Sequence, residues 1–192
     1  TGDSGVLDEP VPFLEGRPVN PEDDSYYDLP GRSSEVASLY EHCLRAIRNG
    51  LRFGERGLPL MRGGDWNDGM NRVGLQGKGE SVWLGFFFCE VLRQFAEVAG
   101  AHGDSAFAEF CVSEGSRLRL NIEQHAWDGE WYRRAYFDDG TPLGSARNDE
   151  CRIDSISQSW SVLSGVSNIE RSRMAMQAVD KHLVRRDDAL IQ

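Results

Sequence analysis

The segment Val82-Trp-Leu-Gly-Phe-Phe-Phe-Cys limits most strongly how this chain can fold. In the helix expected from Glu80 to about Ala99, these side chains would cover the whole circumference instead of one face. A helix of this kind is not stable on a protein surface, because one side would expose large apolar groups to water. The pattern therefore predicts a helix of an inner layer, covered by other elements.

Four further segments have apolar residues at helical spacing. Long helices that alternate between buried and amphipathic favour stacked helical hairpins, as in an α/α barrel or toroid, over a fold built on a sheet. We therefore expect an all-α fold with a short β-hairpin insertion at Trp131 to Phe137 and the turn that follows it. The four expected helices run from Ser33 or Ser34 to about Gly50, from Asp104 to Trp127, from Ser155 to Gly165 and from Asn168 to Arg186.

Both ends of the chain lack a regular pattern. Residues 1 to 33 are rich in Pro, Gly and Asp, which predicts an ordered loop anchored by Tyr26, Tyr27 and Leu29. The first residue is Thr, and the last one, Gln192, follows an apolar pair without a stop signal. We expect residues 1–192 to be a fragment of a single catalytic domain, truncated at both ends.

Composition excludes some classes of function. The net charge of −10 would repel the phosphate backbone of a nucleic acid, so no nucleic-acid partner is expected. No stretch reaches the roughly 20 apolar residues that cross a bilayer, and no signal peptide is recognisable. The histidines have no metal-ligand spacing, so no metal site is expected, and the four cysteines form no Cys-x-x-Cys pair, which suits a reducing compartment. These residues are His42, His102, His125, His182, Cys43, Cys89, Cys111 and Cys151.

Residues 54 to 79 have the composition of a functional loop. They include eight glycines and the run Gly63-Gly-Asp-Trp-Asn-Asp-Gly-Met, and a connection of this length is more often functional than structureless. An indole can stack on the CH face of a sugar, and a protonated carboxyl can give its proton to a leaving glycosidic oxygen. We expect Trp66 and Asp68 in these two roles, with Arg62, Asp65 and Asn67 available for sugar hydroxyls.

Other interpretations of the loop were weighed. The run fails the EF-hand pattern, because Gly69 is fifth, and residues 74–81 fail the phosphate-loop pattern, because Gly79 follows the lysine. One structural alternative stays open, in which Asp65 and Asp68 cap turns and Trp66 lies in the core.

Polar residues outside the loop also have simpler structural explanations. Glu80 suits the first turn of a helix, where the helix dipole favours an acid. Arg133, Arg134 and Asp154 are more typical of solvated or paired groups, although the hairpin and Gln158 could form the wall of a pocket.

Several motifs resemble glycoside hydrolase family 94. They are Gly57-Leu-Pro-Leu, Gly64-Asp-Trp-Asn-Asp-Gly-Met-Asn, Gly77-Lys-Gly-Glu-Ser-Val-Trp and Gln158-Ser-Trp. The segments from Trp131 to Ser145 and from Glu150 to Ile156 are most similar to the phosphorylase-like region of cyclic β-1,2-glucan synthases. The resemblance extends over nearly the whole chain.

The resemblance implies part of an (α/α)6 barrel, with Asp68 as general acid and Trp66 in the subsite of the sugar that is cleaved. Arg62, Asp65, Asn67, Glu80 and Gln158 are then predicted to bind substrate. The implied reaction is inverting phosphorolysis of β-1,2-glucan to α-glucose 1-phosphate. Inorganic phosphate is the co-substrate, and neither a cofactor nor a metal is needed. One carboxylate suffices, because phosphate is already an anionic nucleophile and needs no second carboxylate to activate it.

The family's phosphate-binding residues fall outside this chain, so we expect the isolated fragment to be inactive and marginally stable. The implied partners are a β-linked glucan oligosaccharide, phosphate and the remainder of the parent polypeptide, and a homodimer is compatible with them. The expected location is the cytoplasm, or the cytoplasmic face of the inner membrane within a membrane-bound synthase. Two alternatives are a related β-glucan hydrolase and a non-catalytic sugar-binding α/α domain.

Overall fold

The computed structural model describes residues 2–20 and 26–192, apart from the side chain of Asp68. The chain forms two compact units, Thr1–Arg52 and Phe53–Gln192. Each unit has its own secondary structure, described separately below. That both belong to one catalytic domain stays a prediction.

The first unit is a β-ribbon followed by a helix. A short 3₁₀ helix, η1 (Ser4–Asp8), precedes the antiparallel pair β1 (Pro10–Glu15) and β2 (Gly31–Ser38). Helix α1 (Leu39–Gly50) begins where the Ser38 hydroxyl accepts a hydrogen bond from the Glu41 amide at 3.2 Å. The serine thus satisfies one of the free amides at the helix start.

The ribbon corrects the loop predicted for residues 1–33, and part of that loop, residues 21–25, lies outside the described residues. The helix starts later than predicted, because residues 31–38 pair with β1. Tyr27 and Leu29 are 100% and 92% exposed, so neither is a buried anchor. No residue of β1 or β2 is fully buried, and such a ribbon does not need the apolar alternation that identifies a strand in a sequence.

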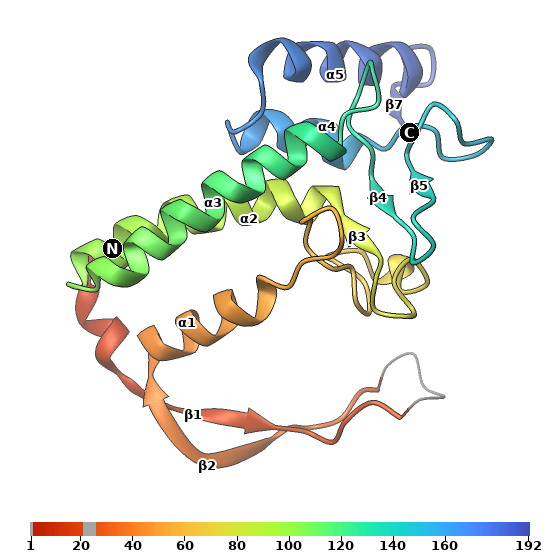
Figure 1. The fold of residues 1–192 in the computed structure, drawn as a ribbon. Coiled ribbons are helices and arrows are strands. Elements are labelled where there is room, and N and C mark those ends of the chain that lie inside the picture. Colours follow the sequence, from red (N-terminus) through yellow and green to blue (C-terminus); the bar gives the residue numbers. More distant parts are fainter. Residues whose placement is uncertain (1, 21–25) are drawn as a thin grey trace. The chain divides into compact units, whose positions relative to one another are not determined.

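The second unit is mainly helical. Helices α2 (Val82–Ala101) and α3 (Ser105–His125) pack side by side, and α2 also contacts α4 (Ser155–Leu163), which packs on α5 (Ile169–His182) (Figure 1). Val82, Phe86 and Leu92 of α2 are fully buried. The predicted helical architecture is confirmed, and α2 is covered by neighbours as its sequence requires. No helix in the described ranges has the length and hydropathy to span a membrane.

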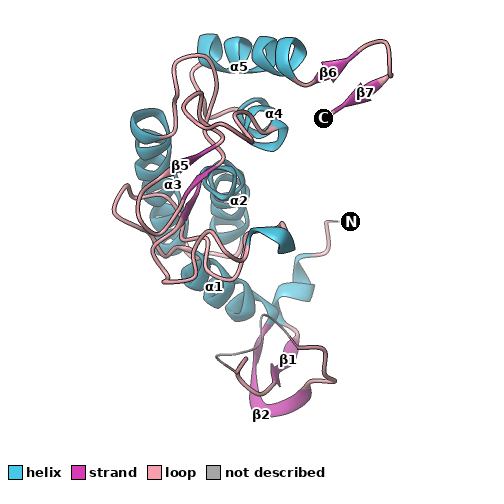
Figure 2. Ribbon diagram, turned by 90° about the vertical axis from the view of Figure 1, so that its right-hand side faces the viewer, coloured by secondary structure: helices cyan, strands magenta, loops and turns pink. Residues whose placement is uncertain are grey.

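Three short strands form a sheet beside these helices (Figure 2). Its order is β3 (Glu80–Ser81), β4 (Ala135–Tyr136) and β5 (Pro142–Leu143), all antiparallel. The predicted hairpin is confirmed as β4 and β5, while β3 was not expected. A second small pair, β6 (Val184–Arg185) and β7 (Leu190–Ile191), follows α5, which therefore ends before the predicted Arg186.

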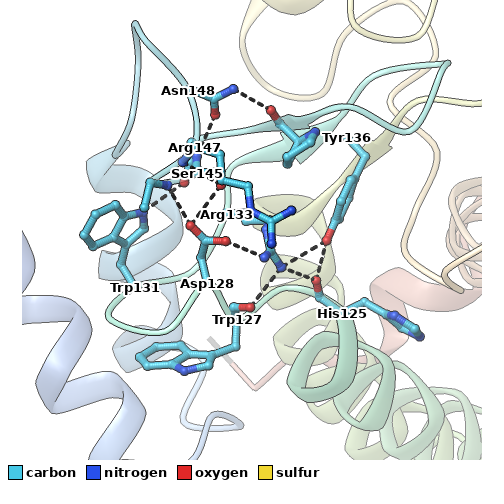
Figure 3. A network of polar contacts seen from close by, with 12 residues as sticks. His125, Trp127, Asp128, Trp131, Arg133, Tyr136, Ser145, Arg147 and Asn148 are labelled. Carbon is cyan, nitrogen blue, oxygen red and sulfur yellow. Dashed lines mark hydrogen bonds and ion pairs between the residues drawn. The ribbon is translucent and has the colours of Figure 1, made fainter.

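The hairpin is fixed to the end of α3 by the network around Arg133 (Figure 3). One guanidinium nitrogen of Arg133 donates to the backbone carbonyls of His125 and Trp127, both at 2.9 Å. Another pairs with Asp128, whose second oxygen accepts the Ser145 hydroxyl at 3.0 Å. The bond to His125 satisfies a carbonyl that the end of α3 leaves free, and together these bonds orient β4 and β5.

We expect Gly79→Ala to destabilise the second unit. A Cβ at Gly79 would lie 2.4 Å from the Val73 carbonyl oxygen, which is backbone and cannot move aside cheaply. The expected loss is about 1–3 kcal/mol of unfolding free energy. Urea unfolding followed by circular dichroism would measure it.

The matched control is Gly63→Ala, because a Cβ there meets nothing within 4 Å. It should change the unfolding free energy by about 0.5 kcal/mol or less. Equal effects of the two substitutions would contradict the packing described for Gly79.

Candidate functional site

Residues 62–78 form one loop, called here the 62–78 loop, that leaves and re-enters the small sheet at the same point. The amide of Met61 donates to the carbonyl of Gly79 at 2.7 Å, and Leu60 forms a bridge with Glu80. Next to them, the amide of Ser81 donates to the carbonyl of Pro59 at 2.8 Å. Both ends of the loop are therefore fixed to β3 and to each other.

Apolar side chains hold the middle of the loop against the sheet. Val73 is 4% exposed and belongs to a cluster with Met61 and Ala135, and Met70 packs against the same cluster. The side chains of Val73 and Met70 in the loop thus pack against Met61 and Ala135. Burial of this apolar surface gives the loop a defined conformation although it contains almost no regular structure.

Asp138 holds the last residues of the loop. Its two carboxylate oxygens accept the backbone amides of Gln76 at 2.8 Å, Lys78 at 2.8 Å and Gly79 at 2.9 Å. Desolvation raises the pKa of Asp138, but these three amide bonds stabilise the charged form and hold the pKa below its usual value. The carboxylate thus replaces the backbone partners that an irregular loop lacks.

Asp65 ties the loop to β4 through a buried ion pair. Its oxygens accept from the two terminal nitrogens of Arg134, at 2.6 and 2.9 Å, and from the Ser81 hydroxyl at 2.7 Å. The Asp65 and Arg134 side chains are 0% and 1% exposed. A two-pronged pair of this kind fixes both distance and orientation.

The ion pair also affects the pKa of Asp65. Desolvation raises the pKa of this carboxyl, but hydrogen bonds from Arg134 and Ser81 outweigh it, so the pKa lies below its usual value. Asp65 also accepts the Asn67 amide at 3.1 Å, which is the turn-capping role of the structural alternative. Asp65 is therefore an ionised structural group, and its predicted contact with substrate stays a prediction.

The next residues present a different surface. Trp66 is 79% exposed, so the interpretation of its indole as a core side chain is wrong. Asn67 accepts the Gly69 amide at 3.0 Å and begins the short 3₁₀ helix η2 (Asp68–Met70). The backbone of Asp68 starts this turn, but its side chain lies outside the described part of the chain. The general-acid role of Asp68 stays a prediction.

A cavity of about 670 Å³ lies at this part of the loop. It is lined by Asp65, Trp66 and Asn67 and, from the first turn of α4, by Ile156. Its size falls within the range of small-molecule sites, and an indole beside polar groups is a typical lining. Arg62 is exposed in the same loop and has a positive φ of 54°.

Glu80 does not line this cavity. Its carboxylate is 1% exposed and accepts the amides of Arg56 at 3.0 Å and Leu58 at 3.2 Å, besides an ion pair with the Arg56 side chain at 3.1 Å. It lies in β3 ahead of α2, so the expectation of a first-turn acid is wrong. Its role in this structure is to hold residues 56–58, and substrate binding by Glu80 stays a prediction.

Gln158 is also engaged with the backbone. Its amide accepts from the nitrogen of Tyr132 at 2.8 Å and donates to the carbonyl of Tyr132 at 2.7 Å. The residue is 0% exposed. It joins α4 to the segment before β4 as a strand neighbour would, and its predicted contact with substrate stays a prediction.

Sequence patterns did not reveal the role of Arg134. Of the two expected states, solvated or paired, the structure shows the paired one, and the partner, Asp65, lies 69 residues away in the sequence. Adjacent side chains of an extended segment point to opposite sides, so Arg133 and Arg134 point away from each other. This alternation is the one signal in the sequence that one of the two arginines faces inward. Ile156 carried no signal at all. In the described residues, no group of three or more His, Cys, Asp or Glu side chains could hold a metal ion.

Comparison with known proteins identifies the family of this chain. The family model of the glycosyl hydrolase 94 superfamily catalytic domain matches residues 2–192. The chain is 50% identical over 186 residues to the cyclic beta-(1,2)-glucan synthase NdvB of Rhizobium meliloti (strain 1021), covering 96% of this chain and 6% of that protein. It is 35% identical to the solabiose phosphorylase of Paenibacillus borealis, covering 95% of this chain and 22% of that protein.

A third relative is the N,N'-diacetylchitobiose phosphorylase of Vibrio proteolyticus, 30% identical over 95% of this chain and 20% of that protein. The chain thus spans about a fifth of the phosphorylases and much less of the synthase. The match of the family model to nearly every residue shows that the chain belongs to the glycosyl hydrolase 94 superfamily, as part of its catalytic domain.

Proposed function

We propose that this chain supplies the sugar subsite and the general acid of an inverting glycoside phosphorylase that converts a β-linked glucan to α-glucose 1-phosphate. The observation that carries the proposal is the exposed indole of Trp66 beside a cavity, two residues before Asp68, on a loop held by a buried ion pair. At 79% exposure, the indole of Trp66 has a free aromatic face that a ligand in the cavity can contact. The pyranose ring of a glucan offers the apolar face that an indole binds.

The proposed chemistry needs one proton donor on this chain. The carboxyl of Asp68 gives its proton to the glycosidic oxygen as the bond between that oxygen and the anomeric carbon breaks. A phosphate oxygen attacks the same carbon from the opposite face, so the β-linkage becomes an α-phosphate. Asp68 is left as a carboxylate and the shortened glucan as an alcohol.

The contacts that hold the 62–78 loop in place support the proposed role of Asp68 as proton donor. A proton donor is effective only if it lies within hydrogen-bonding reach of the leaving oxygen while the sugar is held in place. The loop places Trp66 and the backbone of Asp68 in adjacent positions, and Asp65 and Asp138 hold it on both sides. The cavity can thus be formed before a substrate binds, which avoids the entropy cost of ordering the loop.

The substrate and the complete fold belong to the proposal as well. β-1,2-Glucan is favoured because a relative named as a cyclic beta-(1,2)-glucan synthase is 50% identical to the chain. The pairs α2 with α3 and α4 with α5 would be successive hairpins of an (α/α)6 barrel. The remainder of the parent polypeptide would close the barrel and supply the phosphate-binding residues. The proposed location is the cytoplasm or the cytoplasmic face of the inner membrane, and a homodimer stays a prediction.

In the complete protein, we expect Asp68→Asn to reduce phosphate-dependent release of glucose 1-phosphate from β-1,2-glucan by about 100- to 10,000-fold, because an amide cannot donate the proton. An aryl β-glucoside whose phenolate leaves without protonation should lose less than about tenfold. Enzyme-coupled detection of glucose 1-phosphate measures both.

The matched control is Asp149→Asn, the same change at an exposed residue that does not line the cavity, which should leave the rate unchanged. Equal losses on both substrates would contradict the acid role of Asp68. Release of free glucose in the absence of phosphate would favour a hydrolase.

Trp66→Ala should raise the KM for the glucan by about tenfold, since it removes the stacking surface, whereas Trp66→Phe keeps an aromatic face and should raise it by less than about threefold. The KM for phosphate should stay unchanged in both variants. Steady-state kinetics at varied glucan and phosphate provide the test. A Trp66→Ala variant with wild-type KM for the glucan would mean that the sugar binds elsewhere.

A further inference from the structure

The guanidinium of Arg134 lies between the two elements that line the cavity. Two of its nitrogens bind Asp65, which precedes Trp66 in the 62–78 loop. The third, Nε, lies 3.6 Å from a carboxylate oxygen of Asp154, just before α4. The loop and the start of α4 are therefore joined through one side chain.

Asp154 transmits this contact to the other wall of the cavity. Its second oxygen accepts the amide of Ile156 at 2.8 Å and thereby caps α4. Ile156 is the residue of α4 that lines the cavity. One carboxylate thus faces Arg134 on one side and fixes the backbone of Ile156 on the other.

Ser81 adds a third element to the same cluster. Its hydroxyl donates to Asp65 at 2.7 Å and accepts the Leu84 amide at 3.0 Å, which caps α2. Two helix starts and the loop consequently meet around one buried cation. Because Asp65 and Arg134 are closed off from water, no solvent molecule can replace a lost partner without rearrangement.

We propose that Arg134 is a positioning residue of the active site, which sets the separation of Trp66 on the 62–78 loop from Ile156 on α4 and so the fit of the sugar. Its kinetic consequences rest on the function proposed above. Arg134 is 1% exposed and does not touch substrate, so it acts through Asp65 and Asp154. A cavity wall misplaced by about 1 Å can cost about 100-fold in rate.

Lysine is not equivalent to arginine at this position. A guanidinium presents its nitrogens in one rigid plane, so it can bind both oxygens of Asp65 and still face Asp154. An ammonium is a single point on a flexible stem and cannot keep the three contacts at once. Arg134→Lys therefore keeps the buried positive charge but loses the fixed arrangement of the contacts with Asp65 and Asp154.

Arg133→Lys is the matched control. The neighbouring arginine is also partly buried and pairs with a carboxylate, Asp128, but it belongs to the separate network at the end of α3 (Figure 3). The same substitution there disturbs the attachment of the hairpin to α3 but removes no contact with Asp65 or Asp154. Asp154→Asn is a milder second variant, because its amide oxygen can still cap Ile156.

The test uses the complete parent protein, at a temperature where circular dichroism shows every variant folded. Arg134→Lys should lower kcat/KM for β-1,2-glucan by about 10- to 100-fold. In Arg134→Lys, the KM for phosphate should change by less than about threefold. In Arg133→Lys, both kcat/KM for the glucan and the KM for phosphate should change by less than about threefold. Asp154→Asn should raise the KM for the glucan and lower kcat/KM for it, but by less than Arg134→Lys. Hydrogen exchange of peptides within 62–72 should accelerate in Arg134→Lys only.

The proposal would be overturned if Arg134→Lys and Arg133→Lys had the same kcat/KM for the glucan and the same amide hydrogen exchange. The link to α4 would be overturned if Asp154→Asn had the wild-type KM for the glucan. If the wild-type protein shows no phosphorolysis, the proposed function fails. Amide hydrogen exchange of peptides within 62–72 then still tests the positioning role. Faster exchange in Arg134→Lys alone supports it, and equal exchange in Arg134→Lys and Arg133→Lys overturns it.

Discussion

The position of the 62–78 loop depends on a buried ion pair between Arg134 and Asp65, which also connects the loop to two helix starts. Moving two charges out of water is costly, and the attraction between them offsets that cost only if their geometry is good. Here each carboxylate oxygen has a guanidinium partner, and Ser81 adds a further donor. Removing either member would leave an uncompensated buried charge, so the loop is either docked with the pair intact or displaced. Because Asp65 and Arg134 must stay paired, this part of the 62–78 loop has one position although it lacks regular structure.

The same pair restricts what the charged groups can do in catalysis. Arg134 is neutralised by Asp65 and shielded, so it is not available to bind phosphate. The chain as a whole carries a net charge of −10, which opposes binding of a phosphate dianion. In the proposed reaction, the positive charge that binds phosphate would come from other segments of the parent protein. The proposed role of this chain is to bind the neutral sugar and deliver the proton.

Sequence patterns predicted the parts of the fold that burial dictates. The apolar circumference of residues 82–89 identified α2, and the glycine-rich composition identified the long loop. The ribbon of β1 and β2 was missed, because strands without a fully buried face need no alternating pattern. Local spacing could not separate Asp65 from Asp68 either, since both suit a turn. Only the contact with Arg134, from a distant part of the chain, gives Asp65 its structural role, and burial against the backbone does the same for Glu80 and Gln158.

The most direct measurement of the central claim is the anomeric configuration of the product, followed by proton NMR while the complete protein acts on β-1,2-glucan with and without phosphate. The account predicts that α-glucose 1-phosphate forms as the first product and only when phosphate is present. Release of free sugar without phosphate would contradict phosphorolysis, and a β-phosphate would contradict direct attack with a single carboxyl as proton donor.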